Sequence, residues 1–598
     1  MASAERLALL RAELKRRNLA GFVVPLADEH QGEYVPPHAR RLAWLSGFTG
    51  SAGMAVVLAD RAALFVDGRY TLQARREAGG LFEHFHLTDH PPARWIADML
   101  PAGGRLGFDP WLHLPDQVAA LREACARAGG AFEPCDDNPL DAVWTDRPDP
   151  PLAPVVIQSE AFAGRGAAEK RDEIAGILAE GRLDAAVLAD PASIAWLLNI
   201  RGGDVDHTPL PLSFALLRAD ARVDLFVDSR KLSPAIEAHL GGAVRVRPPD
   251  AFADALDSPD WSGRRVRVDR AHTPFAVTER LTRAGAIVDP GEDPCALPKA
   301  CKNPVELAGC RAAHLRDGAA LCRFLAWLAR EGGSGRVDEL AAEAMAEAVR
   351  RDGLHYRGLS FPSIVGSGPN GAIVHYGVTE ETNRLLRPGE LFLLDSGAQY
   401  LDGTTDVTRT MAVAPDIKDP GDEIRRRFTL VLKGHIAVSS AVFPVGTSGG
   451  QLDILARRAL WAEGLDYDHG TGHGVGSFLS VHEGPQRISK AGGGGPLKPG
   501  MVLSVEPGYY KPEGYGIRLE NLVAVVEAPM PAGGERPLLA FEPLTLAPFD
   551  RALIDPGLLD ARETAWLDSY HARVAAEIGP LVDGETAVWL EGATRKIG

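Results

Sequence analysis

The first 300 residues of this 598-residue chain contain a weak internal repeat, and a repeat of this length sets the architecture before any local pattern is considered. The sequence RLAWL at 41–45 precedes LFVDGR at 64–69, and IAWL at 194–197 precedes LFVDSR at 225–230. A strand-like run comes before each copy, at 21–25 and at 185–188. Helical stretches lie between the copies, at 116–127 and 167–179. We therefore predict two successive α/β domains.

Proline-rich segments mark the predicted domain boundaries. Residues 148–154 and 290–304 are too rich in proline to continue a helix or a central strand. After the second segment, Asn303, Pro304 and Glu306 have the composition of a capped helix start. We expect α/β domains over 1–150 and 151–300, a third domain over 301–545 and a C-terminal extension over 546–598.

The C-terminal extension predicts an amphipathic helix. Trp566, Tyr570, Val574 and Ile578 recur every four residues and would form one apolar stripe. Such a stripe needs a cover, which is either the chain's own third domain or a second subunit. The second choice predicts a homodimer.

Composition excludes several classes of function. Asp and Glu number 80 against 64 Lys and Arg, so the formal charge of −16 argues against broad contact with nucleic acid or anionic lipid. No long uncharged apolar run predicts a membrane span, and Met1–Ala20 is too charged for a signal peptide. The six cysteines form no C-x-x-C pair. We expect a cytoplasmic protein.

Histidines and carboxylates gather between residues 370 and 520, in segments that otherwise predict buried strands. The apolar run 391–394 ends at Asp395, and Asp406 follows across a turn-forming segment. The runs 501–505 and 517–519 end at Glu506 and Glu520 in the same way, which predicts a second hairpin. The sequence HGTGHGVG at 469–476 lies between the two pairs.

Four carboxylates at strand ends need cations. Buried together without compensation, they would raise one another's pKa values strongly. Two divalent ions would balance most of the charge. Oxygen-rich ligation with one imidazole suits Mn(II), Co(II), Fe(II) or Zn(II), and it is poor for copper redox or iron–sulfur chemistry.

These motifs resemble those of the pita-bread metallopeptidases, which include methionine aminopeptidase, prolidase, creatinase and aminopeptidase P. The ligand order Asp, Asp, His, Glu, Glu matches Asp395, Asp406, His473, Glu506 and Glu520. The segments DGTTDVTRT (402–410), HGTGHGVG (469–476) and VHEGP (481–485) are most similar to the long, three-domain, cytosolic aminopeptidases P. The resemblance covers the whole chain and implies two creatinase-like α/β domains before a pita-bread catalytic domain. The C-terminal tail of this subgroup also implies a homodimer.

The resemblance implies a metalloaminopeptidase that hydrolyses the N-terminal Xaa-Pro bond of peptides with a hydroxide bridging two ions. Mn(II) is favoured, with Zn(II) or Co(II) as alternatives. Asp395 would hold one ion, His473 and Glu506 the other, and Asp406 and Glu520 would bridge them. Glu506 would relay a proton, His482 would donate to the developing oxyanion, and His375 would hold the carbonyl on the leaving side. His469 would border the proline pocket, and Arg518 would orient Asp395.

The sequence leaves three alternative functions open. The segment GTSGG at 446–450 matches the G-x-S-x-G pattern of serine hydrolases, although Ser448 precedes a predicted helix and suits a cap. Prolidase, which prefers dipeptides, is the nearest alternative among the metallopeptidases. Some relatives of this fold have lost their ligands and act as binding scaffolds, whereas all five ligand types are present here.

Overall fold

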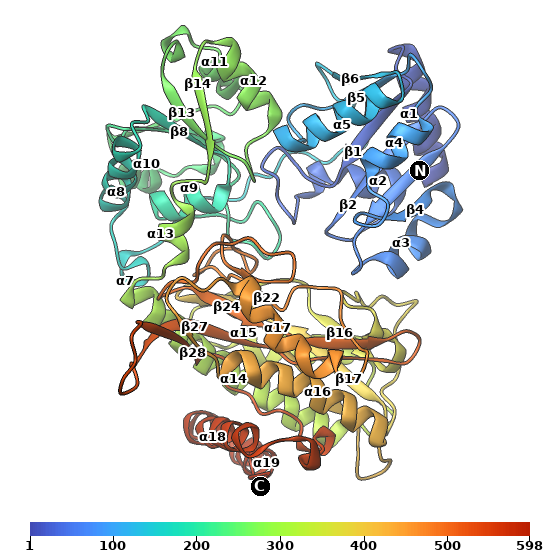
Figure 1. Ribbon diagram of the computed structural model, residues 1–598, viewed down its shortest axis with the longest axis vertical. Coiled ribbons are helices and arrows are strands. Elements are labelled where there is room, and N and C mark those ends of the chain that lie inside the picture. Colours follow the sequence, from blue (N-terminus) through green and yellow to red (C-terminus); the bar gives the residue numbers. More distant parts are fainter. Residues whose placement is uncertain (598) are drawn as a thin grey trace. The chain divides into compact units, whose positions relative to one another are not determined.

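The computed structural model describes residues 1–597, which form two compact units (Figure 1). Unit 1 comprises 1–158 and 165–296, and unit 2 comprises 159–164 and the rest of the chain from 297. Within residues 1–597, no helix combines the length and the apolar character that crossing a membrane requires.

Unit 1 contains two six-stranded sheets that repeat one topology. The first has the order β4-β3-β2-β1-β5-β6, with β1 (Gly21–Pro25), β2 (Gly53–Leu58), β3 (Ala62–Val66), β4 (Glu83–His86), β5 (Arg105–Phe108) and β6 (Ala131–Pro134). The second has the order β12-β11-β10-β8-β13-β14, with β8 (Ala185–Leu188), β10 (Phe214–Arg218), β11 (Val223–Phe226), β12 (Val244–Arg247), β13 (Arg265–Asp269) and β14 (Ile287–Gly291). A small pair, β7 (Val156–Ile157) and β9 (Ile200–Arg201), stands apart.

Corresponding strands of the two sheets also run in the same directions. The centre of each sheet is antiparallel, as in β1–β2 and β8–β10, and each flank is parallel, as in β3–β4 and β11–β12. The repeat is therefore a duplication of structure, as the sequence predicts. Trp44 and Trp196, which mark the repeat, are both buried packing residues.

Helices cover the sheets of unit 1 on their apolar faces (Figure 1). Helix α1 (Ser3–Arg16) begins unit 1, and its Leu7, Leu10 and Leu14 are buried against the first sheet. The helices are α1 (Ser3–Arg16), α2 (Arg41–Ser46), α3 (Thr71–Ala78), α4 (Pro92–Met99), α5 (Pro115–Arg127), α6 (Pro139–Val143), α8 (Ala167–Glu180), α9 (Pro191–Leu198), α10 (Pro234–Leu240), α11 (Ala251–Leu256) and α12 (Phe275–Arg283).

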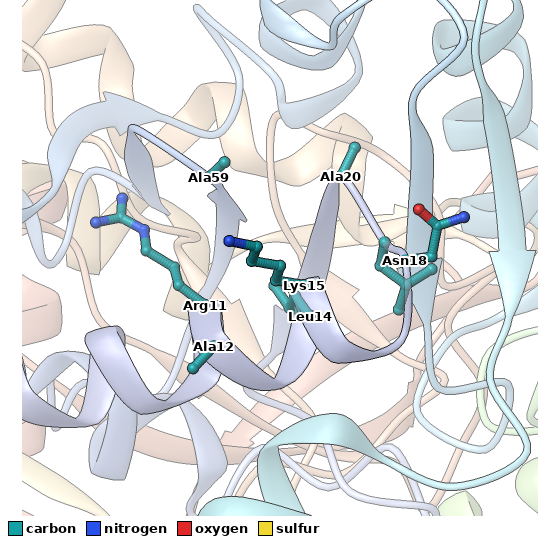
Figure 2. A pocket seen from close by; sticks show the side chains of 8 residues that line it. Arg11, Ala12, Leu14, Lys15, Asn18, Ala20 and Ala59 are labelled. Carbon is teal, nitrogen blue, oxygen red and sulfur yellow. The ribbon is translucent and has the colours of Figure 1, made fainter.

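Unit 1 also has a pocket of about 390 Å³ beside the end of α1. Figure 2 shows Arg11 and Lys15 side chains that rise from consecutive turns of this helix into the pocket lining. The Arg11 Nε donates to the carbonyl of Leu58, 2.9 Å away. No histidine or carboxylate lines the pocket, so it differs in chemistry from the predicted metal centre.

Unit 2 begins with a helix capped as the sequence predicts. The Asn303 side chain accepts from the amides of Val305 and Glu306, and Pro304 is the first helical residue. The helices are α7 (Glu160–Ala163), α13 (Ala296–Ala300, which starts at the unit boundary), α14 (Pro304–Glu331), α15 (Glu339–Arg351), α16 (Asp422–Ser439), α17 (Gly449–Trp461), α18 (Ala561–Ile578) and α19 (Gly584–Ala593).

The strands of unit 2 form small antiparallel sheets, which are packed with α14 to α17. Six strands precede α16 in the chain: β15 (Tyr356–Leu359), β16 (Ile364–Ser367), β17 (Leu391–Ser396), β18 (Ala398–Tyr400), β19 (Gly403–Thr404) and β20 (Val407–Ala412). The others follow it: β21 (Val442–Pro444), β22 (Gly472–His473), β23 (Arg487–Ile488), β24 (Val502–Val505), β25 (Gly508–Lys511), β26 (Tyr515–Arg518), β27 (Asn521–Ala528) and β28 (Leu538–Pro543).

The predicted C-terminal helix is α18, and its apolar stripe is covered by unit 2 itself. Tyr570, Val574 and Ile578 are buried in a core shared with α14 and α16, and Trp566 is partly buried there. Of the two covers that the sequence leaves open, the alternative of a second subunit over this stripe is therefore wrong. The stripe closes the core of its own unit.

Candidate metal centre

The first pair of predicted ligands lies on neighbouring strands. Asp395 is in β17, opposite Thr408 of β20, and Asp406 directly precedes β20. Both aspartates are buried, and β17, which carries Asp395, is the central strand of the sheet β16-β17-β20. The predicted turning-back of the chain between the two acids is present.

The second pair flanks two strand ends that face each other. Glu506 follows β24 and Glu520 precedes β27, and these strands pair through Val505 and Asn521. The expectation that 501–506 pairs directly with 517–520 is wrong, because the hairpin β25–β26 is inserted between the two glutamates. Glu520 consequently lies outside the strand that carries Arg518, although the two side chains reach the same site.

Close backbone contacts fix the segment that carries His473. The His473 amide donates to Ser504 Oγ at 3.0 Å. A Cβ at Gly472 would lie 1.9 Å from the carbonyl oxygen of Ser504, and one at Gly474 would lie 2.1 Å from that of Glu483. The alternating glycines therefore allow two chain segments to approach the histidine from both sides.

Ligand atoms of three predicted residues converge. One atom each of Asp406, His473 and Glu520 lies within 4.8 Å of the others. His473 Nε2 is 3.4 Å from Asp406 Oδ2 and 3.8 Å from Glu506 Oε1. Four of the five predicted ligands thus share one small region, and the fifth, Asp395, is connected to it by the Arg518 contacts described below.

Burial and neighbouring charges shift the pKa values of the predicted ligands. Burial, opposed by the charge of Arg518 and supported by the charges of Asp406 and Glu506, raises the pKa of Asp395 to about 7. Burial also raises the pKa of Glu506, and it raises that of Glu520 well above its usual range. Burial lowers the pKa of His473, but the hydrogen bond with Asp406 and the charge of Glu506 prevail and raise it to about 9.

Two carboxylate oxygens in this region lack a donor. Within residues 1–597, no hydrogen bond reaches the buried Oδ1 of Asp395 or of Asp406. Buried carboxylate oxygens are normally hydrogen-bonded or bound to a cation. Oxygen ligands with one imidazole are the donor set of a hard or borderline divalent ion, so the residues fit such an ion.

Arg518 joins several parts of the site. Its Nη2 donates to Asp395 Oδ2 at 2.6 Å and its Nε to Thr408 Oγ1 at 3.1 Å. Its Nη1 donates to Tyr510 Oη at 2.8 Å and to the carbonyl of Val374 at 3.2 Å. The guanidinium therefore holds one carboxylate oxygen of Asp395 and leaves the other without a hydrogen-bond donor.

The three other predicted histidines lie around this centre. The rings of His482 and His473 are 4.2 Å apart between centroids. His469 Nε2 is 2.9 Å from Tyr510 Oη, so it connects through Tyr510 to Arg518. His375 follows Val374, whose carbonyl binds Arg518.

Sequence reasoning missed three residues that support the site. Thr408 donates to Glu520 Oε2 at 2.8 Å, Ser504 positions His473, and Tyr510 bridges His469 and Arg518. Thr408 and Ser504 lie two residues from Asp406 and Glu506 respectively, a spacing that places strand residues on one face. That spacing was the available signal, whereas the role of Tyr510 depends on the inserted hairpin.

The serine-hydrolase alternative finds no support in the geometry. Ser448 is the N-cap of α17, its amide donates to Gln451 Oε1 at 2.8 Å, and its hydroxyl lies 3.3 Å from the same oxygen. This is the capping role that the sequence predicts.

Comparison with known proteins identifies four matching families along the chain. Creatinase/prolidase N-terminal domains match residues 6–143 and 146–306. Metallopeptidase family M24 matches residues 308–527, and the C-terminal region of peptidase M24 matches residues 537–597. The metal centre lies wholly within the M24 match.

Similar proteins extend over the full length. A probable Xaa-Pro aminopeptidase P of Tuber melanosporum is 39% identical and covers 99% of both chains. Aminopeptidase P1 of Lotus japonicus is 37% identical and covers 97% of both chains. The crystal structure of an X-prolyl aminopeptidase from Caenorhabditis elegans, described as a cytosolic enzyme with a di-nuclear active site, is 35% identical, covers 100% of both chains and has a TM-score of 0.94. The resemblance inferred from the motifs is thereby confirmed, and the chain belongs to metallopeptidase family M24, with two creatinase/prolidase N-terminal domains before its peptidase domain.

Proposed function

We propose that this protein is an Xaa-Pro aminopeptidase that removes the N-terminal residue from peptides with proline in the second position. One observation carries the proposal: Asp406, whose buried Oδ1 lacks a hydrogen-bond donor, and Glu520 lie beside His473 in a chain that is 39% identical to a probable Xaa-Pro aminopeptidase P and covers 99% of it. The chemistry is peptide hydrolysis, as expected of a metallopeptidase.

The centre would hold two divalent ions, with Mn(II) as the favoured metal. Asp395 would bind one ion, His473 and Glu506 the other, and Asp406 and Glu520 would bind both. When bound, such ions lower the pKa of a shared water and polarise a carbonyl oxygen. Mn(II) suits a site with mostly oxygen ligands, and Zn(II) or Co(II) would also fit the donor set.

The side chains around the ions supply proton transfer and orientation. Glu506, 3.8 Å from His473 Nε2, is suited to carry a proton from the attacking water to the leaving imino nitrogen. His482, whose ring packs on that of His473, would donate to the oxygen on which negative charge develops. Arg518 keeps Asp395 in one orientation throughout.

Recognition of the second residue falls to the other histidines. Proline lacks the amide hydrogen that ordinary aminopeptidase sites use, so its ring and carbonyl must be recognised instead. His375 would hold the carbonyl on the leaving side, and His469, fixed by Tyr510, would border the ring.

A cytoplasmic location and a homodimer complete the proposal. The Caenorhabditis elegans neighbour is described as cytosolic, and the six cysteines of this chain form no disulfide within the described residues. Family resemblance is the remaining argument for the dimer, since the α18 stripe is internal.

Three peptides test the specificity. The Mn(II)-supplemented protein should release arginine from Arg-Pro-Pro and leave Arg-Ala-Ala intact. Cleavage of Gly-Pro but not of Arg-Pro-Pro would identify a prolidase instead. Equal cleavage of all three would refute proline recognition.

Chelation tests the metal requirement and the alternatives. Dialysis against EDTA should abolish hydrolysis, and Mn(II) should restore it with about two ions per chain by elemental analysis. Activity that survives EDTA but is lost in Ser448→Ala would favour a serine hydrolase. If the Mn(II)-supplemented protein retains no metal, the alternative of a metal-free binding scaffold would be favoured.

A further inference from the structure

A buried guanidinium lies behind Glu520. Arg409, in β20, is 1% exposed. Its Nη1 donates to the carbonyls of Thr408 at 2.9 Å and Glu520 at 2.6 Å. Its Nε donates to Pro548 O at 3.1 Å, and its Nη2 donates to three further acceptors: Asn521 Oδ1 at 2.8 Å, Ala547 O at 2.7 Å and Tyr570 Oη at 3.1 Å.

All of these acceptors are uncharged. A buried cation without a carboxylate partner is tolerated only when its hydrogen bonds are complete, because each missing bond leaves an unsolvated donor. Half of the acceptors of Arg409 belong to the metal centre and its neighbours, namely Thr408, Glu520 and Asn521. The other half, Ala547, Pro548 and Tyr570, belong to the C-terminal part of the chain.

Helix α18 holds the C-terminal acceptors in place. Tyr570 is buried, and its hydroxyl lies 3.0 Å from the carbonyls of both Thr545 and Ala547. The amide of Phe549 donates to His571 Nε2 at 3.2 Å, and the Phe549 ring lies 4.3 Å from the guanidinium carbon of Arg409. The helix thus presses residues 545–549 against the guanidinium.

On the other side, Arg409 and its neighbour set the position of Glu520. The Glu520 amide donates to the Thr408 carbonyl at 3.1 Å, and the Glu520 carbonyl accepts from Arg409. Thr408 Oγ1 donates to Glu520 Oε2 at 2.8 Å. Both main-chain groups and one carboxylate oxygen of Glu520 are therefore held by residues 408 and 409.

We propose that Arg409 and Tyr570 are positioning residues of the metal centre, through which the C-terminal helix sets the place of Glu520. The proposal rests on the proposed function, since it takes Glu520 as a metal ligand. The proposal gives the C-terminal extension a role inside its own subunit. Helix α18 supplies or positions half of the hydrogen-bond acceptors of Arg409, and Arg409 fixes the main chain of Glu520.

Metal titration of the full-length protein tests this. After dialysis against EDTA, Mn(II) is titrated calorimetrically into the wild type, Arg409→Lys, Tyr570→Phe and the double variant. Arg409→Lys keeps the charge but loses the planar fork, so its Kd for Mn(II) should rise about tenfold. Tyr570→Phe should raise the Kd less, and the double variant should match Arg409→Lys, because both changes act along one path.

Val574→Ala is the matched control. Val574 is buried in the same helix but contacts the apolar core, so its truncation should lower Tm without changing the Kd. If Arg409→Lys lowers Tm in the same way and its Kd equals that of the wild type, the residues are merely structural and the proposal is wrong. Failure of the wild type to bind Mn(II) would instead refute the proposed function.

Hydrogen exchange of the wild type avoids any folding defect of the variants. Coupling is reciprocal: because the docked α18 favours Mn(II) binding, bound Mn(II) should favour the docked helix and slow amide exchange in α18. Helix α5 in unit 1 serves as the reference and should not change. Equal exchange in α18 with and without bound Mn(II) would overturn the proposal.

Discussion

Arg518 shows how much one side chain can organise. Its guanidinium binds Asp395, Thr408, Tyr510 and the main chain before His375. Arg518→Lys should lower the affinity for metal and kcat/KM by about 10- to 100-fold, because an ammonium cannot reach four groups in fixed directions. Metal content and kcat are measured together. Arg311→Lys, at a surface pair with Glu542, is the control and should behave as the wild type. Unchanged values for Arg518→Lys would contradict the orienting role.

The raised pKa values of the centre predict a dependence on pH. In the metal-free protein the pKa of Asp395 is about 7 against an ordinary 3.8, and that of His473 is about 9 against 6.5. The folded state therefore binds these protons more tightly than the unfolded state does. Stability from Asp395 is lost as pH rises from about 4 to about 7, and that from His473 is lost between about 6.5 and about 9.

Metal binding must displace the same protons. The increase in Tm on adding Mn(II) should consequently be larger at about pH 8 than at about pH 6, which thermal melts with EDTA or Mn(II) would measure. Asp395→Asn removes one of these titrations and should reduce the pH dependence of the metal-free protein. An increase in Tm that is independent of pH would contradict the expectation.

At the scale of elements, a buried ion pair anchors the loop that carries His482. Glu483 Oε1 lies 2.6 Å from Lys302 Nζ, just before α14, and both side chains are 1% exposed. Lys299 Nζ lies 3.8 Å from the other oxygen of Glu483. Glu483→Gln removes the negative charge that the two buried lysines share, so we expect a loss of about 3–5 kcal/mol, seen as a lower Tm of the metal-free protein. The exposed pair of Glu123 and Arg127 provides the control, since Glu123→Gln should leave Tm unchanged. A similar Tm for both variants would show that the pair is not stabilising.

Local signals predicted several elements well. The cap of α14 can be predicted from the sequence because Asn303, Pro304 and Glu306 act within one turn. Strand β17 can be predicted because an apolar run ends in Asp395. The duplicated sheets follow from two short matching segments, which keep their places in β3 and β11.

Long-range pairing was less accessible. The sequence places Glu506 and Glu520 near turns, but it does not say whether their strands pair directly or enclose a further hairpin. Periodicity shows that Tyr570 belongs to a buried face, yet its hydroxyl contact with Arg409 joins positions 161 residues apart. Such contacts depend on the packed structure and leave no local pattern.

At the scale of the molecule, the proposed homodimer needs a surface other than the α18 stripe. Light scattering of the full-length protein should give twice the chain mass. Leu567→Ala, which weakens the internal packing of α18, should lower Tm without dissociating the dimer, because Leu567 is fully buried within unit 2. A monomer in the wild type would refute the dimer, and dissociation of the variant would return α18 to the interface.

The proposed domain boundaries near 150, 300 and 545 stay predictions. The two compact units divide the chain differently from a simple succession of domains, since residues 159–164 belong to unit 2 although they lie between segments of unit 1.

That arrangement has a consequence for any shortened protein. Helix α7, within 159–164, packs against α14, where Asn303 Nδ2 donates to the Ala163 carbonyl at 2.8 Å and Phe162 lies against His355. A fragment that starts at 297 would lack this docked piece and expose the beginning of its first long helix. Unit 2, which carries the metal centre, is thus not a detachable C-terminal fragment. An exchange of unit 1 for that of another protein would have to keep residues 159–164 together with unit 2.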